Sequence, residues 1–356
     1  MANSPNHETD RILVIRLSSL GDILLTAPAL RALRSRFPLA RIDFLTSVAY
    51  AELAASLPAI DQVLKFDKRA GVKEFLRWQV LLLRERYSLI IDLQSSFRSA
   101  LWRVFALPAI WVKARRHRLR RFLLIHLRWN LYRTTLPVPL RYLAALEPLG
   151  CQDDGGGLEL QIPEAASHRV GEQIDARGLS REQTIVLCPG ARHATKRWPQ
   201  EKWTDLARGL LCKNHPVLLL GDENDRILIE GITNTLADER VTSFVTLPLL
   251  ETAALIKLGT CVISNDSGLM HLATAVGTPV LALFGPTVEE FGFFPFRAKA
   301  EVIQKQLPCR PCSAMGTERC PKGHFKCMKD ISISEVLDAT FRLIEHRESM
   351  PATCNS

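Results

Sequence analysis

The chain of 356 residues is long enough for two domains with separate cores. Its 47% hydrophobic and 23% charged residues are typical of a globular protein. The first ten residues are polar and acidic, so they predict no signal peptide, and no run approaches the roughly 18 apolar residues of a membrane span. We therefore expect a cytoplasmic protein. In such a protein nine cysteines favour thiols or metal ligands over a disulfide framework.

The positive charge is concentrated in one stretch. The net charge is +9, and residues 93–146 contain no Asp or Glu against eleven Lys or Arg. Subtracting these eleven charges from +9 leaves −2 for the rest of the chain. One segment, which we call the basic segment, therefore carries the whole imbalance.

The first half of the chain alternates apolar runs with amphipathic stretches. The run at 11–16 suits a buried strand, and apolar residues at helical spacing predict a helix from about Ile23 to Arg36. Further strands are expected at 41–46, 62–66 and 89–93, and further helices at 50–57 and 72–86. Because strand and helix alternate at βαβ intervals, the sheet should be parallel and doubly wound.

Asp22 lies where the first strand gives way to the first helix. A carboxylate there is typical of a helix N-terminus, where it caps free N–H groups and is favoured by the helix dipole. The same position also suits a general base in a ligand cleft. Ser18, Ser19 and Gly21 could make the turn without a carboxylate, so both interpretations stay open. No GxGxxG motif follows this strand, which argues against NAD or FAD.

Aromatic residues interleave with the arginines of the basic segment. The segment could bind nucleic acid, dock on anionic lipid head groups and an acidic substrate, or simply form a solvated basic face. The basic run 116–121 stands beside an apolar run at 122–126, which favours a surface with an apolar side. No RRM, KH or zinc-finger pattern accompanies it, so we rank nucleic acid last and expect no such partner.

Strand and helix alternate again after a glycine-rich stretch at 153–157. Strands are expected at 184–188, 217–220, 242–245, 261–264 and 280–284, with helices at 200–212 and 334–346. We therefore predict an N-terminal Rossmann-like domain at 1–160 and a C-terminal one at 161–356. Loops at the carboxyl ends of the two sheets would face a central cleft.

Two charged positions follow strands of the second half. Lys196, in the sequence Lys-Arg-Trp-Pro, would suit a ligand that carries phosphate charge. The alternative is a solvated basic loop, because most lysines are exposed. Glu223 could accept hydrogen bonds from ribose or base hydroxyls. No GK[ST] pattern occurs, so a P-loop NTPase is not indicated.

The stretch 262–287 reads as strand, small polar loop, apolar helix and second strand. A loop such as 264–268 presents free N–H groups at a helix N-terminus and so suits an anion. An ordinary N-capped helix is the alternative. Asp266 and His271 favour a ligand site, because two titratable groups flank the loop where a parallel sheet places its ligand.

Four cysteines and a histidine lie close together near the C-terminus, at Cys309, Cys312, Cys320, His324 and Cys327. They could hold Zn²⁺ or an iron–sulfur cluster, but the second pair is not a CxxC. Buried free thiols or a disulfide formed by oxidation are the alternatives. We assign neither a metal nor a cofactor.

Four motifs, taken together and in this order, resemble glycosyltransferase family 9, the ADP-heptose:lipopolysaccharide heptosyltransferases. They are RLSSLGDILLTAPAL at 16–30, DLQSSFRSAL at 92–101, PGARHATKRWPQEKW at 189–203 and SNDSGLMHLATAVGTPVLALFGPT at 264–287. The resemblance covers about residues 11–345 and implies a GT-B fold, with the acceptor on the first domain and the nucleotide-sugar on the second. The KRWP form and the cysteines are more similar to enzymes that add the second inner-core heptose.

The resemblance also implies a role for each matching residue. Asp22 would be the base that deprotonates the acceptor hydroxyl, and Lys196 would neutralise the donor diphosphate. The other implied donor-binding residues are Glu223 at the nucleoside or sugar, Asp266 at the heptose hydroxyls, Ser267 and Gly268 with N–H groups at the diphosphate, and His271 close behind. No DxD metal motif is present, so cations and helix N-termini would stabilise the leaving ADP.

The resemblance implies an inverting enzyme peripheral on the cytoplasmic face of the inner membrane. There the basic segment, residues 93–146, would meet the phosphates and Kdo carboxylates of the lipopolysaccharide acceptor. One rival is a GT-B transferase with another nucleotide sugar or acceptor. The other is a non-catalytic protein on the same scaffold that binds lipid A or nucleic acid.

Overall fold

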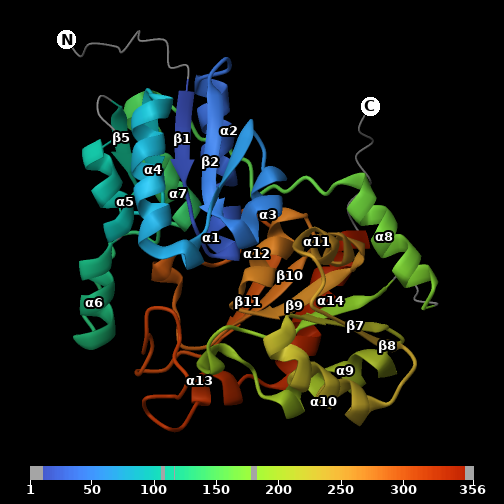
Figure 1. Ribbon diagram of the computed structural model, residues 1–356. Coiled ribbons are helices and arrows are strands. Elements are labelled where there is room, and N and C mark those ends of the chain that lie inside the picture. Colours follow the sequence, from blue (N-terminus) through green and yellow to red (C-terminus); the bar gives the residue numbers. More distant parts are fainter. Residues whose placement is uncertain (1–10, 106–108, 116, 178–182, 349–356) are drawn as a thin grey trace. The chain divides into compact units, whose positions relative to one another are not determined.

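The computed structural model describes residues 11–105, 109–115, 117–177 and 183–348 (Figure 1). They belong to two compact units: Met1–Arg116 with Val138–Gly156, and His117–Pro137 with Gly157–Ser356. Part of the basic segment thus groups with the second unit. Our sequence-based boundary at residue 160 keeps that whole segment in the N-terminal half, and it stays a prediction.

The first unit is built on a five-stranded sheet in the order β3-β2-β1-β4-β5, with every neighbouring pair parallel. Leu13 of the central strand lies between Asp43 and Ile90 of its two neighbours. The strands are β1 (Arg11–Ile15), β2 (Arg41–Ser47), β3 (Gln62–Phe66), β4 (Leu89–Asp92) and β5 (Ile110–Lys113). The central strands are buried, as expected where helices cover both faces of a parallel sheet.

The helices of the first unit follow its strands in the predicted alternation. They are α1 (Leu20–Leu24), α2 (Ala27–Arg36), α3 (Ala51–Ala55), α4 (Gly71–Glu85), α5 (Phe97–Trp102) and α7 (Val138–Leu146), with 3-10 turns at Val48–Tyr50, Lys68–Ala70, Arg103–Phe105 and Glu147–Leu149. The single helix predicted from Ile23 is in fact α1 and α2. Pro28 explains the break, because it has no N–H to donate to Leu24 and its ring crowds that carbonyl.

Large aromatic side chains fill the core between α4 and its sheet. Trp78 and Trp102 are almost completely buried, with ring centroids 6.4 Å apart, and Phe66 packs edge-on against Trp102 at 5.6 Å. The indole N–H of Trp78 donates to the buried Glu74 at 2.9 Å, so this polar atom keeps a partner. The inner face of α4 is therefore a conventional core surface.

The second unit is built on a six-stranded parallel sheet in the order β11-β10-β9-β6-β7-β8. Its strands are β6 (Ile185–Cys188), β7 (Val217–Gly221), β8 (Val241–Val245), β9 (Cys261–Asn265), β10 (Val280–Phe284) and β11 (Ala300–Gln304). Strands β7 and β8 follow β6 on one side of it, and β9, β10 and β11 follow on its other side. This order is that of a doubly wound dinucleotide-binding sheet.

Helices of the second unit other than α6 lie around that sheet, whereas α6 is drawn away from it (Figure 1). The helices of this unit are α6 (Arg118–His126), α8 (Glu164–Asp175), α9 (Gln200–Cys212), α10 (Arg226–Leu236), α11 (Leu249–Leu258), α12 (Gly268–Ala275), α13 (Lys326–Lys329) and α14 (Ile333–Glu348), with 3-10 turns at Ala194–Lys196, Glu223–Asp225 and Glu289–Phe291. Trp203 of α9 and Val336 of α14 belong to one core with Ile263 of β9. The predicted fold class, two doubly wound parallel α/β units, is confirmed.

The basic segment is more regular than its sequence indicates, since it contains α5, β5, α6 and α7. Specific contacts attach residues 117–137 to the second unit. The guanidinium of Arg121 lies 4.9 Å from the ring centroid of Phe291, and Arg128 Nη1 donates to the carbonyl of Pro311 at 2.5 Å. Within the described ranges, no helix is long and apolar enough to cross a membrane.

Candidate active site

The second unit places its ligand loops where its strand order reverses, between β6 and β9. In doubly wound sheets ligands bind outside the carboxyl ends of the strands at this switch point. The loop after β6 runs from 189 to 199 and contains Lys196, and the loop after β9 contains Asp266 and Ser267. The fold therefore brings two loops that are far apart in sequence to the same edge of one sheet.

Lys196 and Asp266 form a buried ion pair at this edge. Lys196 Nζ lies 2.6 Å from Asp266 Oδ2, and their side chains are only 14% and 7% exposed. Thr287, which follows β10, donates its hydroxyl to the same Oδ2 at 2.6 Å. Such a pair holds the ammonium group in one place, which a solvated surface lysine would not achieve.

Asn265 anchors the lysine loop to the sheet at both ends. Its Nδ2 donates to the carbonyl of Pro189 at 2.7 Å, and its Oδ1 accepts from the backbone N–H of Trp198 at 3.1 Å. The Asn265 side chain is fully buried, so both bonds are shielded from water. Lys196 is thus fixed by the last residue of β9 as well as by its partner Asp266.

The helix α12 begins directly behind this pair, with Ser267 as its N-cap residue and Gly268 as its first residue. In this described part of the chain, the Ser267 side chain makes no capping hydrogen bond, and its hydroxyl lies 3.2 Å from that of Ser264 instead. The first N–H groups of α12 therefore suit an anionic group of a ligand. His271 is buried one turn further along the helix, 4% exposed.

Glu223 begins the 3-10 turn that follows β7 and is not part of the lysine–aspartate pair. Arg226 donates to both of its carboxylate oxygens at 2.7 Å, and Thr246 donates to Oε2 at 2.9 Å. These hydrogen bonds from Arg226 and Thr246 lower the pKa of Glu223 to about 2. The exposed carboxylate is therefore ionised at neutral pH and suited to accept hydrogen bonds from hydroxyl groups.

Asp225, which the sequence did not single out, lies between the loops after β6 and β7. Its carboxylate is so close to Gly190 that a Cβ there would come within 2.0 Å of Oδ2, so any larger residue would displace the Asp225 side chain. Arg197 Nη2 lies 3.7 Å from Asp225 Oδ1, and Arg197 Nε donates to Ala191 at 2.7 Å. Burial, aided by the nearby Asp222, raises the pKa of Asp225.

The cysteine-bearing loop supports the turn that carries Lys196. Thr195 Oγ1 accepts from the N–H of Thr317 at 2.8 Å, and Thr195 N donates to the Thr317 carbonyl at 3.0 Å. A Cβ on Gly316, where φ is +101°, would lie 3.2 Å from Lys196 Cγ. This loop therefore stabilises the turn that carries Lys196.

The four cysteines themselves are free thiols, and Cys309 Sγ lies 3.7 Å from His324 Nε2. Across the described residues, no group of three or more His, Cys, Asp or Glu side chains is arranged to hold a metal ion. Burial raises the pKa of Cys327 to about 11, so this thiol is protonated at neutral pH.

In the first unit, Asp22 occupies the corresponding switch point between β1 and β4. It is the third residue of α1, and its Oδ2 accepts from the backbone N–H and the hydroxyl of Ser19 at 3.1 and 3.0 Å. Arg16 Nη2 lies 2.5 Å from Oδ1. Ser19 is therefore the N-cap, and Asp22 adds the reciprocal bond to the N-cap backbone.

Arg16, like Asp225 of the second unit, is a residue that the sequence analysis did not single out. Its side chain is almost fully buried, and Nη1 donates to the carbonyl of Leu93 at 2.6 Å. Burial alone would raise the pKa of Asp22, but Arg16 and Ser19 stabilise the carboxylate and lower that pKa overall. Asp22 is consequently ionised at neutral pH and able to accept a proton.

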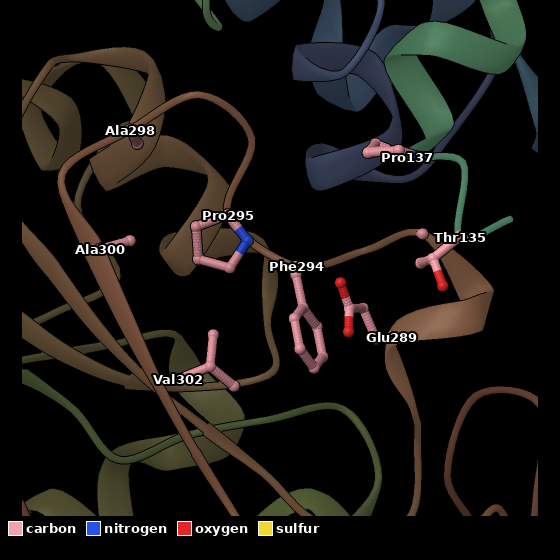
Figure 2. A pocket seen from close by; sticks show the side chains of 9 residues that line it. Thr135, Pro137, Glu289, Phe294, Pro295, Ala298, Ala300 and Val302 are labelled. Carbon is pink, nitrogen blue, oxygen red and sulfur yellow. The ribbon is translucent and has the colours of Figure 1, made fainter.

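A separate pocket of about 210 Å³ lies in the second unit near β11 (Figure 2). Figure 2 shows the Phe294 ring and the Glu289 carboxylate beside each other in it. Its described lining includes Thr135 and Pro137 of the basic segment, but none of the individual site residues predicted from the sequence. Because ligand pockets usually measure roughly 300–1,000 Å³, we do not assign a ligand to this small, mainly apolar space.

Comparison with known proteins identifies the class of this two-unit scaffold. The Escherichia coli ADP-heptose lipopolysaccharide heptosyltransferase II structure superposes with a TM-score of 0.73 and 26% identity, over 95% of this chain and 100% of that one. Lipopolysaccharide heptosyltransferase 2 of E. coli K12 is 30% identical over 83% of this chain and 88% of that protein. Lipooligosaccharide heptosyltransferase 2 of Haemophilus influenzae is 30% identical over 82% and 88%. The fold is that of the GT-B glycosyltransferases.

Residues 76–322, well over half of the chain, match glycosyltransferase family 9 (heptosyltransferase). The chain belongs to this family and is a glycosyltransferase. The family resemblance seen in the four sequence motifs is therefore confirmed.

Proposed function

We propose that the protein transfers heptose from ADP-heptose to a hydroxyl group of the lipopolysaccharide inner core. The observation that carries this proposal is the buried Lys196–Asp266 pair next to the N-terminus of α12. It combines a fixed cation with oriented N–H groups, and a nucleotide diphosphate needs both. The named relatives act in lipopolysaccharide or lipooligosaccharide synthesis, which supports the same donor and acceptor classes here.

The donor diphosphate would lie between Lys196 and the N–H groups of Ser267 and Gly268. As the bond from the anomeric carbon to the ADP oxygen breaks, its electron pair remains on ADP and negative charge grows there. A fixed ammonium group and a helix N-terminus stabilise that charge most strongly when it is fully developed, which lowers the barrier. Asp266 would orient Lys196 and hold heptose hydroxyls, with His271 behind it and Glu223 at the nucleoside or sugar.

Asp22 would act as the general base. The acceptor oxygen attacks the anomeric carbon from the face opposite ADP, and its proton passes to the Asp22 carboxylate, so the configuration inverts. A lowered pKa suits this role, because the acceptor hydroxyl becomes strongly acidic only while the new bond forms. Arg16 would position the carboxylate from the side of Oδ1.

The basic segment, residues 93–146, would contact the phosphates and carboxylates of the acceptor on the cytoplasmic face of the inner membrane. Its part in the second unit supports this assignment, because exposed apolar and basic side chains alternate there. Phe122 and Trp129 are 54% and 61% exposed, and Arg120 and Arg133 of the same stretch are also exposed. This mixture suits an anionic lipid surface.

A thermal-shift panel of nucleotide sugars tests the donor assignment. ADP-heptose and ADP should raise the melting temperature, because a ligand that binds only the folded state stabilises it. UDP- and GDP-sugars at equal concentration are the matched controls and should raise it less. A larger shift with a UDP- or GDP-sugar would contradict the assignment and favour a GT-B transferase with another donor.

A further inference from the structure

The helix α4 of the first unit has an unusual outer face. Val72, Leu76, Val80 and Leu83 are 73%, 52%, 63% and 53% exposed. Their spacing of four, four and three residues places them in one stripe along the helix. A surface helix normally turns polar side chains outward, yet α4 is apolar on this face as well as on the face that buries Trp78.

The charges that flank this stripe are all positive on the exposed side of the helix. Lys73, Arg77 and Arg84 are exposed. The two carboxylates of α4 are engaged elsewhere: Glu74 is buried and bound to Trp78 and Arg77, and Glu85 lies 2.7 Å from Arg11. The stripe and its cations together form what we call the α4 face.

The neighbouring elements extend the α4 face. Helix α5 and the turn Arg103–Phe105 pack against α4, as Figure 1 shows for the two helices. Leu101 and Val104 are 40% and 67% exposed there, and Arg103 is exposed between them. The sequence from 93 to 146 contains no Asp or Glu, so this extension adds apolar groups and cations without any carboxylate side chain.

We propose that the α4 face is a membrane-docking surface that lies in the head-group region of an anionic bilayer. An amphipathic helix with an apolar stripe bordered by lysine and arginine binds such surfaces by burying the apolar side chains and pairing the cations with lipid phosphates. A second copy of the chain fits less well, because two such faces would bring like charges together. The inference extends the membrane contact of the proposed function to a helix outside the basic segment.

The test measures binding of the full-length protein to sedimented vesicles, without any transfer reaction. A variant with Val72→Gln, Leu76→Gln, Val80→Gln and Leu83→Gln keeps every charge, and glutamine is a good helix former. We expect its affinity for phosphatidylcholine–phosphatidylglycerol vesicles to fall at least about tenfold. Leu39→Gln with Ile227→Gln, which removes apolar side chains that are 98% and 85% exposed elsewhere, is the matched control and should bind as wild type.

A charge variant distinguishes binding to anionic lipid from nonspecific hydrophobic adsorption. The variant Lys73→Gln with Arg77→Gln and Arg84→Gln should bind vesicles that contain phosphatidylglycerol more weakly than the wild type does. Its binding should also depend less on the salt concentration, because fewer charges remain to be screened. Equal binding of wild type and the four-glutamine variant would overturn the proposal. The proposal would also be overturned if vesicle binding were lost only in the variant Phe122→Gln with Trp129→Gln. A four-glutamine variant that changes its oligomeric state but keeps its vesicle affinity would overturn it as well.

The same variants distinguish this inference from the proposed function. The four-glutamine variant should transfer heptose to a water-soluble, delipidated acceptor at the wild-type rate, because α4 carries none of the proposed site residues. Vesicle binding without any transfer by the wild type would contradict the proposed function and leave the docking surface standing. Transfer without vesicle binding by the wild type would overturn the docking surface alone.

Discussion

Asp22→Asn should reduce kcat by about 10²- to 10⁴-fold, the usual contribution of a general base, and leave the affinity for ADP unchanged. Asparagine has nearly the same shape and still offers an oxygen to the N–H of Ser19, so the start of α1 should be preserved. Stopped reactions with ADP-heptose and a purified acceptor give kcat, and calorimetric titration gives the ADP affinity. A kcat near that of wild type would contradict the base assignment.

The pH profile separates a base from a structural carboxylate. Because the pKa of Asp22 is lowered, its carboxylate should become protonated only below the ordinary pKa of an aspartate. The kcat/KM of the wild type should therefore fall only in that acidic range. Arg16→Gln removes the paired cation, so the acidic limb should move to higher pH, while Arg16→Lys should keep it close to the wild-type position. A purely structural Asp22 would leave the position of that limb unchanged in Arg16→Gln.

Lys196→Gln should lower kcat/KM by about 10²- to 10³-fold, as expected when a group that stabilises leaving-group charge is removed. The same change should weaken ADP binding and leave adenosine binding unchanged, because the ammonium group acts on phosphates. Paired titrations of the two ligands check this. Equal ADP affinity in wild type and Lys196→Gln would contradict the assignment.

Asp266 complicates that experiment, because removal of Lys196 leaves its buried carboxylate without a cation. Loss of one member of a buried pair can cost about 3–5 kcal/mol of stability. The variant that combines Lys196→Gln with Asp266→Asn avoids this charge imbalance and serves as the control. It should melt closer to wild type than Lys196→Gln alone and still bind ADP weakly.

Much of the fold was predictable because it rests on regular patterns. Apolar runs separated by helical stretches located most strands, and α9 agrees with its predicted range of 200–212. The helix breaks and the elements of the basic segment were harder. Its arginines conceal the burial pattern of α6, where only Leu124 is buried, and β5 has exposed ends typical of an edge strand.

The site was predictable where a residue follows a strand, and less so where a partner comes from far away in sequence. Lys196 and Asp266 are 70 positions apart (266 − 196), and only the parallel pairing of β6 with β9 brings them together. Thr287, 21 positions from Asp266 (287 − 266), was missed for the same reason. Arg16 is only six positions from Asp22 (22 − 16), and its place directly after β1 was the one available signal for it.

The central claim is heptose transfer, and mass spectrometry of one reaction tests it most directly. Purified protein is mixed with ADP-heptose and a truncated inner-core acceptor, and the acceptor mass and released ADP are followed together. We predict that the acceptor gains a single heptose for each ADP released and that Asp22→Asn nearly abolishes both. An unmodified acceptor and intact ADP-heptose, in the presence of folded protein that binds ADP, would contradict the account.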